Sequence, residues 1–166
     1  MNYAKIKNVD VANGEGVRVS LFVSGCTHHC KGCFNAELWN FEAGEPFTFH
    51  TIRKILELCS KDYISGLSLL GGEPLDPMNV ERVTDLCYLF KRYFPQKTIW
   101  CYTGYKWDVI KHFPVLKHID VLVDGKFVQD LADPRLKFRG SSNQRIIAVR
   151  PSLESGQIYL RKDLMK

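Results

Sequence analysis

The sequence predicts an α/β fold: an open partial (βα) barrel of about five mainly parallel strands, in one domain over residues 1–166. Three observations predict it. Short apolar runs typical of strands alternate along the chain with segments whose apolar residues recur at helical spacing. Most of these runs end at a glycine-containing turn, and the residues suited to chemistry follow directly. About five strands are too few to close a barrel, so we expect one open side.

Length and composition suit a single core. The chain has 166 residues, of which 45% are hydrophobic. No apolar run reaches the roughly 20 residues that a membrane helix needs, so we expect a soluble protein without a membrane partner. The net charge is +5, but the basic residues are scattered and no nucleic-acid recognition motif frames them. A mildly basic, solvated surface is therefore favoured over nucleic-acid binding.

The strands are predicted from apolar runs and the residues that stop them. Residues 1–13 are mixed, and we expect an irregular lead-in or a short strand there. Apolar residues then alternate with other residues over 17–23, which predicts a strand that ends at Gly25. The same reasoning predicts further strands at 66–70, 97–102, 119–123 and 145–149, and a last edge strand at 157–160.

Three segments show helical spacing. Their predicted extents are 52–59 with Thr48 or Thr51 as the cap, 76–94 with Asp76 as the cap and Pro77 in the first turn, and 107–113. Strands that alternate with helices imply βαβ units and a parallel sheet. The turns at 71–74, 103–104 and 124–126 should therefore meet the segment after Gly25 at one edge of that sheet, where such folds place their sites.

Three cysteines directly follow the first predicted strand, at Cys26, Cys30 and Cys33. A cluster of four irons normally takes four cysteine thiolates, one for each iron, and this loop offers only three. The fourth iron would keep an open position, which separates a reactive metal site from a structural one. The spacing therefore predicts a [4Fe-4S] cluster that also binds a ligand from outside the protein.

The cysteines could also serve as disulfides, as zinc ligands or as core residues. A disulfide framework is disfavoured, because the start of the chain has no apolar leader segment and six cysteines without a leader indicate a reducing, cytoplasmic location. Structural zinc held by the three cysteines with His28 or His29 is possible, although both histidines lie between ligands, where reaching the same metal would strain the loop. Burial in a core fits the remaining three cysteines better: Cys59, Cys87 and Cys101.

A longer pattern surrounds the three cysteines and resembles a known family. It runs Gly14-x-Gly16-x-Arg18-x-x-x-Phe22-x-x-Gly25-Cys26-x-x-x-Cys30-x-x-Cys33-x-Asn35. This is similar to the signature of the radical S-adenosylmethionine enzymes that install glycyl radicals, whose folds are also partial (βα) barrels. The short length and the segment 121–145 resemble the members of that family that act on anaerobic ribonucleotide reductases.

The resemblance implies an activity. A reduced [4Fe-4S] cluster would cleave S-adenosylmethionine to methionine and a 5′-deoxyadenosyl radical. That radical would take a hydrogen from a glycine in the large subunit of anaerobic ribonucleoside-triphosphate reductase. An electron donor such as reduced flavodoxin would be a second partner. The alternatives are an activator of another glycyl-radical enzyme, such as one of the pyruvate formate-lyase type, or a zinc-binding module without catalytic activity.

The resemblance also implies cofactor contacts, with no catalytic side chain beyond the cluster and cofactor. Residues 71–74 match the family's Gly-Gly-Glu-Pro motif, whose backbone and acid meet the ammonium of the cofactor. The matched positions here are Gly71, Gly72 and Glu73. The others are Lys126, facing the cofactor carboxylate, and Gly32, Cys33 and Phe34, in the part of the loop where related enzymes carry an aromatic residue that contacts the adenine.

Several of these residues could instead have ordinary structural roles. A simple turn accounts for Lys126 nearly as well, and Phe34 could belong to the core, because related enzymes carry their aromatic residue just before the third cysteine. His28 and His29 are expected to be solvated loop residues. Arg18 is either a surface charge or a support for the cysteine loop. The segment 139–145 is a docking surface or a polar loop.

Overall fold

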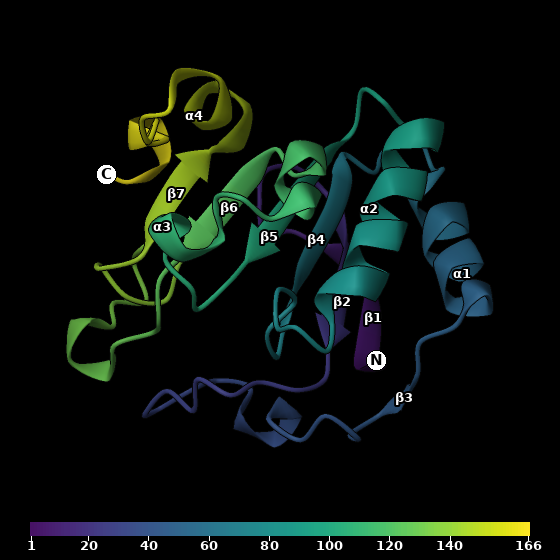
Figure 1. Cartoon of the computed structure of the whole chain (residues 1–166), viewed down its shortest axis with the longest axis horizontal. Helices are drawn as coiled ribbons and strands as arrows, with labels where there is room; N and C mark the ends of the chain where they lie inside the picture. Colours follow the sequence, from purple (N-terminus) through teal and green to yellow (C-terminus); the bar gives the residue numbers. More distant parts are fainter.

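The computed structural model describes all 166 residues and contains one seven-stranded sheet in the order β3-β1-β2-β4-β5-β6-β7 (Figure 1). The strands are β1 (Asn2–Asp10), β2 (Arg18–Val23), β3 (Glu45–Pro46), β4 (Gly66–Gly71), β5 (Thr98–Tyr102), β6 (Val121–Asp124) and β7 (Arg145–Ala148). The helices are α1 (Phe49–Cys59), α2 (Val80–Tyr93), α3 (Trp107–Ile110) and α4 (Val149–Ser155). The α/β class predicted from the sequence is confirmed.

The four central strands, β2, β4, β5 and β6, are parallel to one another. Strands β1 and β7 run antiparallel to them, and the edge strand β3 is antiparallel to β1. The predicted count of about five strands was wrong. The segment 1–13, expected to be an irregular lead-in or a short strand, contains the nine-residue β1. This strand pairs with β2 although most of its residues are polar. The predicted strand at 145–149 ends at Ala148 and is antiparallel to β6. The segment 157–160 contributes a single bridge, between Ile147 and Leu160, and no strand.

The boundaries of two helices also differ from the prediction. Asp76 was predicted to cap the second helix, but α2 begins at Val80 with Asn79 at the cap position. Asp76 instead shapes the preceding turn, because its Oδ1 accepts a hydrogen bond from the Met78 backbone at 2.9 Å. The third helix ends at Ile110, and a separate 3₁₀ turn starts at Pro114. Proline lacks the backbone N–H that would extend the hydrogen bonding of the preceding helix.

The helices pack on one face of the sheet and form the main core with it (Figure 1). Every second residue of the central strands faces these helices, as Leu21, Leu69 and Cys101 do. Cys59 and Cys87 lie in the same core, so the expectation that these three cysteines are buried is confirmed. None of the helices combines the length and the apolar composition that a membrane span requires.

The opposite face of the sheet is partly polar, and Arg18 lies on it, fully buried. Its guanidinium donates five hydrogen bonds, all to neutral oxygens: Ser68 Oγ, the carbonyls of Glu15, Leu67 and Thr98, and Thr98 Oγ1. The alternative of a surface charge was therefore wrong. Burial lowers the pKa of Arg18 to about 10, which leaves it protonated at neutral pH. It ties β2 to β4 and β5 at the end of the sheet away from the cysteines.

We predict that Arg18→Lys lowers the free energy of unfolding by about 2 kcal/mol, because an ammonium donates at most three hydrogen bonds and leaves buried oxygens unpaired. Urea unfolding of the metal-free protein measures this change. The exposed Arg53 on α1 provides the control: Arg53→Lys should change stability by less than about 0.5 kcal/mol. Equal effects of the two substitutions would contradict the assigned role of Arg18.

Candidate metal centre

The turns that follow the parallel strands meet at one edge of the sheet, as predicted. A pocket of about 460 Å³ opens there. Its lining includes seven of the residues expected from the sequence: Cys26, Cys30, Cys33, Phe34, Gly71, Gly72 and Glu73. Gly32 and Lys126 lie outside this lining. In Figure 1 the segment after β2 crosses below the lower ends of the central strands.

The cysteine loop, residues 26–39, is closed at its base by backbone hydrogen bonds. The Gly25 N–H donates to the Leu38 carbonyl at 2.8 Å, and the Cys26 N–H donates to the Trp39 carbonyl at 3.1 Å. Within the loop, the Cys33 N–H donates to the Cys30 carbonyl at 3.1 Å. The three thiols are thus presented by a loop whose two ends are held together.

The three thiols are free and half-buried, and backbone donors surround them. Burial raises the pKa of the Cys26 thiol, and hydrogen bonds from the backbone N–H groups of His28 and His29 offset part of this rise. Burial also raises the pKa of Cys30, which the Phe127 N–H and the Lys126 charge partly offset. Such donors stabilise thiolates, and hydrogen bonds to sulfur are a normal feature of iron–sulfur sites.

These features fit an iron–sulfur cluster held by three thiolates. The Asn35 N–H also points at Cys33 Sγ, at 3.4 Å. No group of three or more His, Cys, Asp or Glu side chains is gathered closely enough to hold a single metal ion. A cluster does not need that arrangement, because each thiolate meets a different iron.

The turn at 71–73 packs tightly against the end of β2. The Gly72 N–H donates to the Val23 carbonyl at 2.8 Å, and the Glu73 N–H donates to the Gly25 carbonyl at 2.7 Å. A Cβ on Gly72 would overlap the Gly25 carbonyl oxygen, and Gly71 has a φ of 104°, which favours glycine. Both glycines are therefore needed to bring the two turns together, whatever ligand lies beside them.

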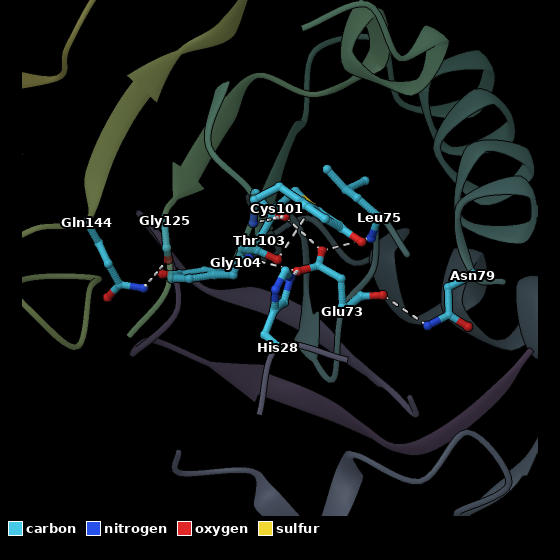
Figure 2. Close-up of polar contacts among 11 residues, drawn as sticks. His28, Glu73, Leu75, Asn79, Cys101, Thr103, Gly104, Gly125 and Gln144 are labelled. Carbon is cyan, nitrogen blue, oxygen red and sulfur yellow. Dashed lines mark hydrogen bonds and ion pairs between the residues drawn. The ribbon is translucent and has the colours of Figure 1, made fainter. Parts of the chain in front are cut away.

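The Glu73 side chain is 1% exposed and holds three segments together (Figure 2). Its Oε1 accepts from the Thr103 hydroxyl at 2.8 Å and from the Leu75 N–H at 3.0 Å. Its Oε2 accepts from the Gly104 N–H and from His28 Nε2, both at 2.7 Å. Thr103 was not predicted to have a role, and the only signal for it was its place in the turn after β5.

The two histidines of the loop differ. The expectation of a solvated residue was wrong for His28, whose side chain is 8% exposed and which lies edge-on to Tyr105. His29 is exposed, as expected, and its ring stacks on that of Trp39 with the ring centroids 4.4 Å apart. Sequence spacing alone could not separate them, because the difference lies in which one faces Glu73.

The segment 126–140 forms the far side of the pocket and contacts the cysteine loop. A Cβ on Gly32 would come within 2.8 Å of Gln129. Phe34 is 76% exposed, so the alternative that it belongs to the core was wrong. Its ring centroid lies 5.2 Å from that of Phe127. The Lys126 side chain is exposed. Pocket residues between 127 and 144 that sequence reasoning missed, or placed only within a segment, are Phe127, Leu136, Phe138, Arg139, Gly140 and Gln144.

We predict that three of the six thiols react with a maleimide in the folded, metal-free protein. Cys59 and Cys87 lie in the core, and burial raises the pKa of each thiol to about 12. These two thiols should therefore react only when the protein unfolds. The reaction of Cys26 and Cys30 should accelerate as pH rises, because the thiolate is the nucleophile. Mass spectrometry of the labelled peptides measures the sites, with urea-unfolded protein as the control. Labelling of the core thiols at the same rate would contradict the structure.

Comparisons with known proteins show the family to which the chain belongs. Residues 12–147 match the model of the 4Fe-4S single cluster domain. The chain is 47% identical over 146 residues to the anaerobic ribonucleoside-triphosphate reductase-activating protein of Enterobacteria phage T4, which covers 88% of this chain and 93% of that protein.

Two bacterial proteins of the same name are equally similar. Identity is 48% over 150 residues with the Haemophilus influenzae protein, covering 88% of this chain and 97% of that one. It is 47% over 148 residues with the Escherichia coli protein, covering 87% and 96%. The chain therefore belongs to the 4Fe-4S single cluster domain family and, within it, to the family of the anaerobic ribonucleoside-triphosphate reductase-activating proteins.

Proposed function

We propose that this protein is a radical S-adenosylmethionine enzyme that generates a glycyl radical on the large subunit of anaerobic ribonucleoside-triphosphate reductase. It would cleave S-adenosylmethionine reductively and use the 5′-deoxyadenosyl radical to take hydrogen from one glycine. The observation that carries the proposal is the pocket that joins the three cysteines to the Gly71-Gly72-Glu73 turn. The names of the relatives support the choice of partner.

The residues that would hold the cluster are Cys26, Cys30 and Cys33. When bound, the cluster supplies one electron and an iron with an open position, to which the amino and carboxylate groups of S-adenosylmethionine can chelate. The protein then has to orient the cofactor and exclude water. The backbone N–H groups that donate to Cys26 and Cys30 would support the first task by holding these two cluster ligands in place.

The pocket is large enough to be a site for S-adenosylmethionine. Its volume of about 460 Å³ lies within the usual range for small-molecule sites, about 300–1,000 Å³. Gly71 and Gly72 would offer backbone carbonyls to the ammonium, and Phe34 an apolar surface to the adenine, beside Gly32 and Cys33. The exposed Lys126, whose charge acts on the Cys30 thiol, would reach the cofactor carboxylate.

The reductase has to bring its glycine into the same space. A radical of this reactivity must be shielded from solvent, so the target segment should cover the open side of the pocket. Arg139 and Gln144 line the pocket and belong to the segment 139–145, which would contact the partner. A one-electron donor, such as reduced flavodoxin, would approach the cluster from outside.

We predict that anoxic protein reconstituted with iron and sulfide, then reduced, forms 5′-deoxyadenosine from S-adenosylmethionine. Cys30→Ala should reduce the yield to that of a cluster-free sample, because one iron loses its thiolate. Liquid chromatography measures the product. Cys59→Ala is the matched control, since that thiol lies in the core away from the pocket, and it should keep the product. Full yield from Cys30→Ala would exclude Cys30 as a ligand.

The partner is tested separately. Mixed with the large subunit of anaerobic ribonucleoside-triphosphate reductase, the active protein should produce the doublet of a glycyl radical in electron paramagnetic resonance spectra. A parallel sample with pyruvate formate-lyase should stay silent. A doublet from pyruvate formate-lyase alone would assign the protein to the other class of activator, and a colourless, zinc-loaded preparation would exclude the radical chemistry altogether.

A further inference from the structure

The Glu73 carboxylate has no acceptor position left for a ligand. A carboxylate offers about four lone-pair sites, and here four protein donors use them. The donors come from the cysteine loop, the turn after β4 and the turn after β5. Because the side chain is almost fully buried, an incoming ammonium would have to displace one of these hydrogen bonds.

His28 is the donor that links this carboxylate to the cysteines. It lies midway between Cys26 and Cys30, and its Nε2 is 2.7 Å from Glu73 Oε2. Figure 2 shows the imidazole pointing at the carboxylate, beside Gly104. A Cβ on Gly104 would overlap the ring, and Tyr105 contacts it with centroids 4.6 Å apart. The imidazole ring is therefore closely packed between its neighbours at the edge of the sheet.

We propose that His28 and Glu73 are positioning residues, which together hold the cysteine loop in the conformation that takes up the cluster. Ordering a free loop costs conformational entropy when the metal binds, and a loop already fixed at its middle avoids much of that cost. Residues that orient metal ligands through hydrogen bonds typically change metal affinity about 10–100-fold when they are replaced.

The proposal has a consequence for the cofactor, which rests on the proposed function. Glu73 acts on S-adenosylmethionine through the protein, by holding the Gly71-Gly72 turn beside the cysteines. The ammonium is then received by backbone carbonyls of that turn, and not by the Glu73 carboxylate. The carboxylate of the motif thus positions the cysteine loop, and the backbone carbonyls of the two glycines receive the ligand.

The test compares two substitutions that differ only in the donor. His28→Gln keeps an N–H donor near the position of Nε2. His28→Leu introduces a side chain of similar bulk that has no hydrogen-bond donor. We expect His28→Leu to lose iron to a chelator about tenfold faster than the unchanged protein, and His28→Gln to stay within about threefold of it. The control is His29→Asn, at a position with a φ of 50° that asparagine tolerates, and it should not change the rate.

Two further measurements separate positioning from general stability. Thermal unfolding of the metal-free variants should differ less than their iron retention does. Glu73→Gln should lose iron as His28→Leu does, and the double variant should be no worse than either single one, because the two residues act as a unit. If Glu73→Gln fails to fold, the two His28 variants still decide the matter.

Equal iron retention by His28→Leu and the unchanged protein would overturn the proposal, as would equal losses from His28→Gln and His28→Leu. These outcomes do not depend on the reaction. If iron retention follows the donor but no variant forms 5′-deoxyadenosine, the positioning role stands and the proposed function fails. If Glu73→Gln keeps its iron but binds S-adenosylmethionine more than tenfold more weakly, the carboxylate contacts the ligand and the proposal is wrong.

Discussion

The contact between the carboxyl ends of β2 and β4 is the constraint on which the site depends. The two strands pair in parallel from Arg18 with Gly66 to Val23 with Gly71. Their following turns therefore leave the sheet together, and the Gly25 carbonyl accepts the Glu73 N–H at their junction. A side chain at Gly72 would force these turns apart, because its Cβ would overlap the Gly25 backbone, whereas a side chain at Gly25 would overlap the Phe41 ring. The cysteines reach Glu73 only because this junction is so close.

Much of this arrangement could be predicted from the sequence, because it follows from topology. Parallel strands end at one edge, so cysteines after one strand and a Gly-Gly-Glu turn after the next had to be neighbours. Burial of Cys101 followed equally from its place in an apolar run. These inferences need only the direction and order of strands, which apolar patterns and turns indicate.

The rest could not be predicted, because it depends on partners distant in the sequence. The mostly polar β1 is a strand because the edge of β2 offers it backbone hydrogen bonds, and no side-chain pattern indicates that. His28 and His29 look alike in sequence, and only the fold decides which one meets Glu73. Arg18 is buried because Ser68 and Thr98 supply oxygens from two other strands. Charged residues are rarely fully buried, so composition favoured the surface.

The closed base of the cysteine loop fixes both of its ends at the edge of the sheet, in addition to the contact that His28 makes with Glu73. Backbone hydrogen bonds from Gly25 to Leu38 and from Cys26 to Trp39 hold the two ends of the loop together beside the end of β2. The segment that carries the three cysteines is thus attached to the sheet at defined points. A substitution elsewhere in this segment should therefore leave its attachment to the sheet intact, provided that the cysteines and the side chain facing Glu73 are kept.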